Sequence, residues 1–206
     1  MSESRSCTTR ERLIEAALAL VWECSYQATS VDAICERAGV KKGSFYHFFS
    51  SKSDLAVAAL EAQWENRRPE MEALFSPDIP PLERLERYFD RVLEGQTALA
   101  REKGRVLGCP LMSLGCEIST QDPAIGQKVH ELLIRNRGWF EQAVSDAAVA
   151  GVIRVSNPVI TAHALFSYYE GTLAQARIQN SLEPIRALKA GAMELLGAVP
   201  APALPA

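Results

Sequence analysis

The sequence lacks the patterns that mark secreted, membrane-spanning and metal-binding proteins. Its first residues, MSESRSCTTRER, hold no apolar run of signal-peptide length, and no later stretch is long and apolar enough to span a bilayer. We therefore expect a cytoplasmic protein with no membrane partner. No Cys-X-X-Cys pair occurs, so we expect reduced thiols, no metal and no cofactor. The five cysteines are Cys7, Cys24, Cys35, Cys109 and Cys116.

Catalytic signatures are missing as well. The chain has no nucleophile–base motif, no phosphate-binding loop and no histidine–glutamate metal pair at helical spacing. Its histidines, His47, His130 and His163, fall on separate expected helices. We predict that the protein is not an enzyme. The alternative, a helical small-molecule-binding protein or an enzyme without a DNA-binding role, would have to be assembled from residues that give no sequence signal.

Acidic residues are absent between Arg37 and Ser53, although the whole chain carries a net charge of −3. The same stretch also contains Lys41, Lys42 and Lys52. Such a local basic patch is what contact with phosphate requires. The alternative is a merely solvated turn, and the helix pattern around the patch favours the first interpretation.

The N-terminal third carries three capping boxes, in which a Ser or Thr precedes an acidic residue by three positions. They are Thr8 with Glu11, Thr29 with Asp32, and Ser51 with Asp54. The boxes predict a first helix from about Thr9 to Cys24, a short second helix ending at Gly39, and a longer one that stops at Arg68 before Pro69. A further short helix, KKGSFYHFF, follows the second after a tight turn. Two short helices joined by a glycine-containing turn indicate a helix-turn-helix motif.

The remaining two thirds are also helical by pattern. An apolar face that begins at Leu82 ends at Gly104, and Cys109-Pro110 opens a short helix. Asp122-Pro123 and Asn157-Pro158 each place proline at the first helical position after an N-cap. We therefore expect an all-α fold. Residues 1–52 would form a helix-turn-helix DNA-binding domain, residues 53–198 an effector-binding and dimerisation domain, and residues 199–206 a flexible tail.

The last two expected helices suggest a dimer interface. From Val159 to Ala176 the only formal charge is Glu170, so this helix must be buried between two surfaces. The final helix, from about 183 to 196, has one apolar face. Together they favour a dimerising four-helix bundle, the alternative being that both complete the chain's own core. The residues expected at the dimer interface are Ile185, Leu188, Ala192 and Leu195.

The segment from Val40 to Lys52 has the arrangement of a recognition helix. Such a helix lies in the major groove of double-stranded DNA, with short polar side chains at its start reaching base edges and flanking groups binding phosphate. Phe45, Phe48 and Phe49 are expected to anchor it to the core. The residues expected to contact DNA are Thr29, Lys41, Lys42, Gly43, Ser44, Tyr46, His47 and Lys52.

The residues Thr29 to Asp54, TSVDAICERAGVKKGSFYHFFSSKSD, resemble the helix-turn-helix of the TetR family of transcriptional regulators. The shared features are the Ala-Gly-Val turn, the Lys-Gly-Ser-Phe-Tyr-His-Phe core and the closing Ser-Lys. Ser25 departs from the pattern, since many members have glycine there. The resemblance implies about nine helices, a homodimer, a palindromic operator and, usually, repression relieved by a small-molecule effector.

Two segments of the effector domain, GCPLMSLGCE and AQARIQNSLEPIRAL, resemble the subfamily of NemR and AcuR, which respond to reactive electrophiles and to acrylate. The resemblance makes Cys109 the counterpart of a sensing cysteine, and Arg177 falls where NemR has a lysine near that cysteine. Arginine cannot supply a neutral amine to trap an oxidised thiol, so that role does not carry over. Pro110 also departs from the usual large aliphatic residue.

The order Gly108-Cys109-Pro110 gives a physical reason for thiol reactivity. Proline favours the first helical position, so Cys109 would sit at the N-cap, where the helix dipole stabilises a thiolate. The alternative is an inert Cys109 and a reversibly bound ligand, such as a carboxylate paired with Arg177. The expected effector-binding residues are Cys109, Met112 and Cys116 on one side and Trp139, Phe140, Phe166, Tyr169 and Arg177 on the other.

Overall fold

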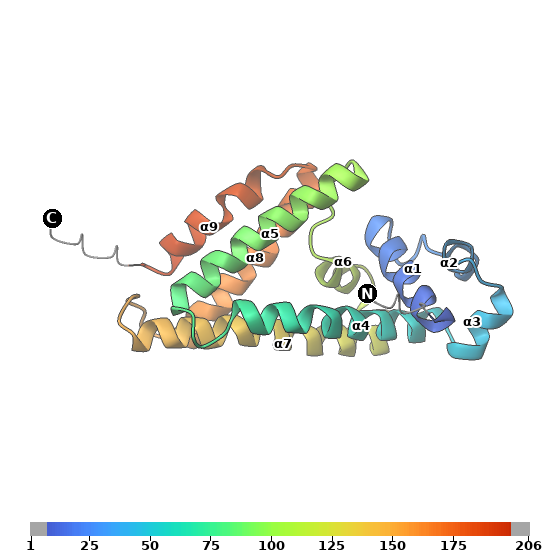
Figure 1. The fold of residues 1–206 in the computed structure, drawn as a ribbon, viewed down its shortest axis with the longest axis horizontal. Helices are drawn as coiled ribbons and strands as arrows, with labels where there is room; N and C mark the ends of the chain where they lie inside the picture. The colour runs from blue at the N-terminus through green and yellow to red at the C-terminus, as the bar shows by residue number, and fades with distance from the viewer. Residues whose placement is uncertain (1–7, 199–206) are drawn as a thin grey trace, which may run out of the picture. The chain divides into compact units, whose positions relative to one another are not determined.

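The computed structural model describes residues 8–198, which form nine helices and no strand (Figure 1). The expected all-α class is confirmed. Cys7 and the expected tail at 199–206 lie outside the described residues. Within residues 8–198, no helix is both long and apolar enough to cross a membrane. The helices are α1 (Thr9–Glu23), α2 (Val31–Ala38), α3 (Lys42–Phe48), α4 (Lys52–Leu74), α5 (Pro81–Lys103), α6 (Pro110–Ile118), α7 (Pro123–Val149), α8 (Pro158–Gln179) and α9 (Glu183–Leu195).

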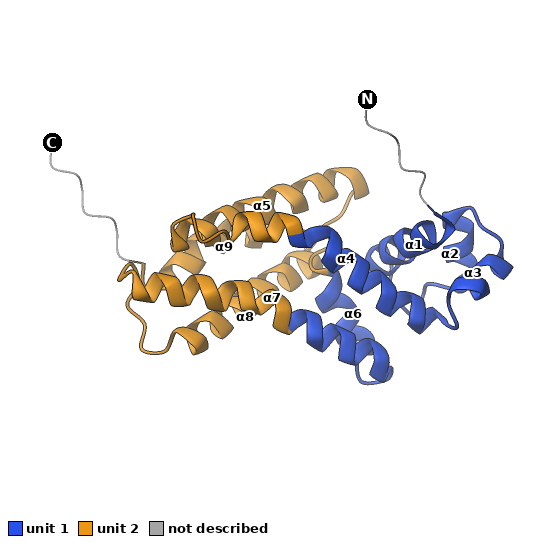
Figure 2. Cartoon of the chain, turned by 60° about the horizontal axis from the view of Figure 1, so that its bottom comes forward, with its two compact units in different colours: residues 1–68, 110–133 blue, residues 69–109, 134–206 orange. Residues whose placement is uncertain are grey.

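The chain packs as two compact units (Figure 2). Of the described residues, 8–68 and 110–133 form the first unit, and 69–109 and 134–198 form the second. Helices α4 and α7 each contribute to both. This division by packing differs from the functional boundary that the sequence predicts at residue 52, because the first part of α4, the whole of α6 and the start of α7 pack with the helix-turn-helix.

The core of the first unit fixes the helix-turn-helix. Leu13 of α1, Ile34 of α2 and Phe45 of α3 are almost fully buried in one cluster, which also includes Phe49. The prediction that Phe45 and Phe49 are anchors is confirmed, but it is wrong for Phe48, which is 39% exposed. Phe48 lies on the outer side of the short α3, with its ring edge-on to His47.

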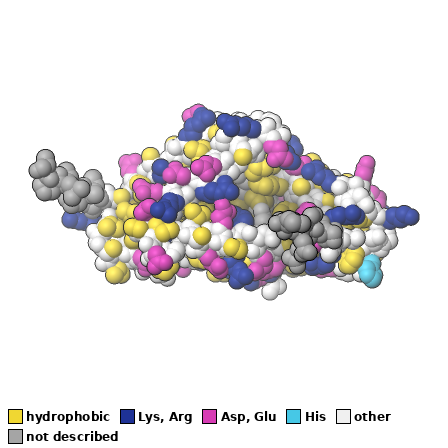
Figure 3. Space-filling model, viewed as in Figure 1, with side chains coloured by type: hydrophobic (Ala, Val, Ile, Leu, Met, Phe, Trp, Pro, Cys, Tyr) yellow, Lys and Arg dark blue, Asp and Glu magenta, His cyan; other side chains and the backbone are white. Residues whose placement is uncertain are grey.

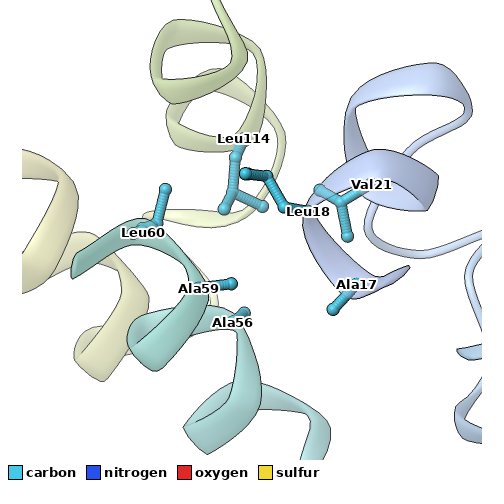
Figure 4. A pocket seen from close by; sticks show the side chains of 7 residues that line it. All are labelled: Ala17, Leu18, Val21, Ala56, Ala59, Leu60 and Leu114. Carbon is cyan, nitrogen blue, oxygen red and sulfur yellow. The ribbon is translucent and has the colours of Figure 1, made fainter. Parts of the chain in front are cut away.

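A small apolar cavity lies among α1, α4 and α6 in the first unit (Figure 4). Its volume of about 20 Å³ is close to that of a single water-sized probe, so it has no room for an organic effector. Three of the seven residues that line it are alanines, whose small side chains leave the space open. The lining residues are Ala17, Leu18, Val21, Ala56, Ala59, Leu60 and Leu114.

The core of the second unit is an aromatic cluster contributed by α5, α7, α8 and the residue after α4. Neighbouring ring centroids lie 5.3–6.3 Å apart in edge-on or tilted geometry, the arrangement that aromatic quadrupoles favour. The buried hydroxyls of Tyr88 and Tyr169 are hydrogen-bonded to each other at 2.9 Å. The clustered rings are those of Phe75, Tyr88, Phe89, Phe140, Phe166 and Tyr169.

The apolar face of α9 is buried inside its own chain. Ile185, Leu188 and Ala192 are 2%, 0% and 0% exposed, because α9 packs against α5 and α8. The prediction that these three residues meet a second subunit is therefore wrong, and the alternative, that they complete the chain's own core, holds. Leu195 alone of the four expected interface residues remains on the surface, 40% exposed.

Two helix boundaries differ from expectation. Ser30, not Thr29, caps α2, because its hydroxyl accepts the N–H of Ala33. Helix α4 continues through Pro69 to Leu74. Proline removes one backbone hydrogen bond, but Met71 and the following Phe75 are both buried, and this burial offsets the loss.

Most other start signals are confirmed. Thr8 and Glu11 form a reciprocal capping box on α1, and Asn157 caps α8. Ser51 accepts the N–H of Asp54. Asp122 accepts the first N–H groups of α7, and a hydrogen bond from Ser53 holds the pKa of Asp122 below its ordinary range, assisted by those N–H groups.

We predict that Asp122→Ala destabilises the protein by about 1 kcal/mol at neutral pH, the usual cost of a lost N-cap. Because the folded state lowers the pKa of Asp122, its stabilisation is complete above the unfolded pKa of about 4 and disappears as the pH falls through the lower folded value. Urea titrations of wild type and variant should therefore converge below about pH 4. Asn157→Ala is the matched control, since a cap that does not titrate should cost the same at every pH. A cost of Asp122→Ala that stays constant with pH would contradict the assignment.

Candidate DNA-binding and effector sites

Helix α3 of the first unit carries most of the residues expected to contact DNA, and most of its side chains are exposed. It follows a turn in which Gly39 takes a left-handed conformation, φ 64°, and donates its N–H back to α2. Tyr46 is 56% exposed, and basic side chains with one histidine are visible over α2 and α3 in Figure 3. The expected residues that lie on this surface are Lys41, Lys42, Gly43, Tyr46 and His47, with Ser44 half-buried.

The basic patch around α3 is partly neutralised within the protein. Lys42 forms a 2.8 Å ion pair with Asp32 of α2, and the hydrogen bond between them raises the pKa of Lys42. Arg37 pairs with Glu23 at 3.0 Å. At Gly43 an added Cβ would meet no atom within 4 Å, so the start of α3 offers bare backbone to a ligand.

Thr29 and Lys52 do not belong to the exposed surface. Thr29 is 3% exposed, and its hydroxyl donates to the carbonyl of Ser25. The ammonium of Lys52 donates to the carbonyls of Tyr26 and Thr29, both at 2.9 Å, and lies 4.1 Å from the Tyr26 ring centroid. Burial lowers the pKa of Lys52. Lys52, expected at a phosphate, thus binds the α1–α2 turn.

Glu117 of α6 holds the other side of the α1–α2 turn. Its two carboxylate oxygens accept the backbone N–H groups of Tyr26 and Gln27, each at 2.9 Å. The turn itself is closed by Ser25, whose hydroxyl accepts the N–H of Ala28. Sequence reasoning missed Glu117, because a carboxylate 90 residues from its partner in sequence leaves no spacing signal.

Cys109 lies beside a buried carboxylate in the second unit. Its half-buried thiol is 3.5 Å from Oε1 of Glu170 on α8, within hydrogen-bond range for sulfur, and Glu170 is only 4% exposed. The helix α6 does begin at Pro110, directly after Cys109, as expected. Glu170 was not expected at the site, yet it is the only formal charge between Val159 and Ala176, and that isolation was the signal that could have identified it.

The loop before Cys109 is held rigidly. The buried amide of Gln96 bonds Gly108 in both directions, donating to its carbonyl at 3.0 Å and accepting its N–H at 3.1 Å. Gly108 has φ 65°, and a Cβ there would lie 2.8 Å from the carbonyl oxygen of Leu173. Arg177 donates to the carbonyl of Leu107 at 2.8 Å, so this guanidinium supports the loop.

The other expected effector residues fall into two groups. Phe140, Phe166 and Tyr169 are buried members of the aromatic cluster, and Trp139 is half-buried with its ring 5.7 Å from Phe75. Met112 and Cys116 belong to α6 in the first unit, where Met112 is half-buried and Cys116 is exposed.

Comparisons with known proteins agree with this arrangement. Residues 13–59 match the family model of bacterial regulatory proteins of the tetR family, and residues 81–191 match that of the tetracyclin repressor-like C-terminal domain. The repressor KstR of Rhodococcus jostii is 33% identical over 74% of this chain and 71% of its own. The regulator AcuR of Cereibacter sphaeroides is 29% identical over 85% of this chain and 79% of its own. The crystal structure of reduced Escherichia coli NemR superposes with a TM-score of 0.79, covering 93% of this chain and 99% of that one at 23% identity.

An exposed recognition helix on a three-helix core, followed by a larger helical domain, defines a DNA-binding transcriptional regulator. The chain belongs to the TetR family.

Proposed function

We propose that this regulator binds a palindromic operator as a homodimer, acts as a repressor, and is released by a small thiol-reactive effector that adds to Cys109. The observation that carries the proposal is the pairing of an exposed recognition helix in one unit with a cysteine beside a buried carboxylate in the other. The rival function, a helical binding protein or enzyme without a DNA-binding role, has no comparable support, because it would leave the exposed α3 unexplained.

In the DNA complex, α3 of each subunit would enter successive major grooves, about 34–36 Å apart. Lys42, Ser44 and Tyr46 would contact base edges, and Lys41 and His47 would contact phosphates. Gly43 would let the backbone approach the duplex. Nothing lies within 4 Å of an added Cβ, so packing within the protein does not require glycine at this helical position. Close approach of DNA would require it.

We predict that Gly43→Ala leaves thermal stability unchanged or raises it, by up to about 1 kcal/mol, because alanine favours helix over glycine. Its affinity for operator DNA should nevertheless fall at least about tenfold, since the methyl group would occupy space that the duplex needs. The measurement is fluorescence anisotropy with a duplex selected from random DNA by the wild-type protein. Gly138→Ala in α7, which also meets nothing within 4 Å, is the control and should bind like wild type. Wild-type affinity in Gly43→Ala would remove the close approach from the proposal.

The dimer interface is proposed on the outer stripe of α8 rather than on the face of α9. Ile160 and Ile178 are 66% and 83% exposed, and the stripe between them carries no formal charge. Small residues let two helices approach closely, so a second copy of the chain can pack there as half of a four-helix bundle. The stripe consists of Ile160, Ala164, Ser167, Gly171, Ala174 and Ile178.

We predict that Ile178→Glu converts the dimer into a monomer, because two unpaired carboxylates would be buried across the symmetry axis at a cost of several kcal/mol. Sedimentation velocity at micromolar concentration measures this. Val149→Glu at the end of α7 is the matched control: Val149 is 88% exposed but off the stripe, and its variant should remain dimeric. A dimeric Ile178→Glu protein, or a monomeric wild type, would overturn the proposed interface.

Glu170 gives the thiol of Cys109 a base. The proton on Sγ can pass to Oε1 of Glu170 as Sγ forms a bond to the electrophilic carbon of an activated alkene. The alkene's π electrons then move to the neighbouring carbon, which takes the proton back, so the adduct forms without an oxidant. A bulky adduct beside the rigid Gly108 loop would displace the chain that leads into α6. The reversible alternative, a carboxylate on Arg177, would have to compete with the carbonyl of Leu107.

We predict that N-ethylmaleimide releases the wild-type protein from its operator and leaves Cys109→Ser bound. Intact-protein mass spectrometry would count the adducts while anisotropy follows DNA binding. Cys116→Ser, which removes an exposed thiol from α6, is the control and should be released like wild type. Equal release of Cys109→Ser and wild type would reject Cys109 as the sensor.

A further inference from the structure

Two side chains of opposite charge, Glu117 and Lys52, hold the α1–α2 turn from two sides and together form a clamp. Glu117 of α6 accepts the turn's N–H groups, and Lys52 of α4 donates to its carbonyls, with all four nitrogen–oxygen distances at 2.9 Å. The gripped segment, Tyr26–Thr29, is short and closed on itself by the N–H of Thr29 bonding to the carbonyl of Tyr26. The four residues of this segment therefore move together when the side chain of Glu117 or Lys52 shifts.

We propose that Glu117 is a positioning residue that ties the orientation of the helix-turn-helix to α6, with Lys52 as its counterpart on α4. The turn leads directly into Ser30, the N-cap of α2, and α2 packs against α3. A shift of α6 larger than the tolerance of a hydrogen bond, a few tenths of an ångström, must either drag the turn or break both bonds. Either outcome changes the placement of α3.

The position of Glu117 in α6 links this clamp to the effector site through the chain. Helix α6 begins at Pro110, one residue after Cys109, and Glu117 lies about 10.5 Å further along it at 1.5 Å per residue. A short helix is stiff, so a displacement of its first residue, Pro110, also displaces Glu117. This coupling rests on the proposed effector site at Cys109, whereas the clamp itself does not.

The experiment compares Glu117→Gln with wild type in operator binding without effector. Glutamine has one acceptor oxygen for two donors, so binding should weaken roughly tenfold. The slope of log affinity against log salt should not change, since no phosphate contact is lost. Hydrogen exchange at the amides of Tyr26 and Gln27 should accelerate. Wild-type affinity or unchanged exchange at these amides would overturn the proposal.

Two further carboxylate variants provide controls. Glu61→Gln removes a charge from an ion pair with Lys128 in the same unit, away from the turn, and should bind DNA like wild type. Glu117→Asp keeps the charge on a shorter side chain and should give intermediate affinity and exchange. It also decides the matter if Glu117→Gln does not fold, because wild-type behaviour of the aspartate variant in both measurements would overturn the proposal.

Lys52→Met tests the other half of the clamp. It should weaken binding with an unchanged salt slope, and its effect should be non-additive with that of Glu117→Gln, because both act on one turn. A slope lower by about 0.9 would show that Lys52 binds a phosphate and would remove it from the clamp.

The effector arm compares operator affinity before and after treatment with N-ethylmaleimide. The ratio should be smaller in Glu117→Gln than in wild type, because a broken clamp no longer transmits the shift of α6. An unchanged ratio would overturn the coupling. If wild type keeps its affinity after labelling, the proposal about Cys109 fails, while the measurements without effector still decide the role of Glu117.

Discussion

The two hydrogen bonds that the backbone N–H groups of Tyr26 and Gln27 donate to the carboxylate of Glu117 are the constraint on which the rest of the first unit depends. They join α6, a nine-residue helix, to the turn from which the recognition motif starts. The core behind α3 is a continuous set of apolar contacts, which adapts poorly to partial displacement. A shift that reaches the turn is thus passed on to the helix-turn-helix as a whole.

The second unit is built around an equally rigid element, the Gly108 loop. Its backbone is satisfied by the side chain of Gln96 and supported by Arg177, so the chain leaves the aromatic core in a fixed direction. Fixing the loop holds the Cys109 thiol against Glu170. When an effector adds a few atoms to a thiol held in this way, the loop must move as a whole. A flexible loop would instead rearrange locally around the added atoms.

Local chemistry was predictable from the sequence, and long-range pairing was not. Asn157, Asp122 and Gly39 act through the few residues next to them, so their roles at helix ends could be read from the sequence. Periodicity showed that Leu188 faces something apolar, but it could not say whether that surface belonged to the same chain. Lys52 was misassigned for the same reason, since its carbonyl partners lie more than twenty residues away in sequence.

The placement of the tryptophans gives each unit its own optical signal. Trp22 and Trp64 belong to the first unit, and Trp139 is the one tryptophan of the second. The indole N–H of Trp139 is buried and has no hydrogen-bond partner among the described residues. An indole whose N–H is buried emits at shorter wavelength than one whose N–H faces water, and its emission is sensitive to any water that reaches the ring. Phenylalanine at positions 22 and 64 would therefore leave a protein whose tryptophan fluorescence reports on the second unit alone.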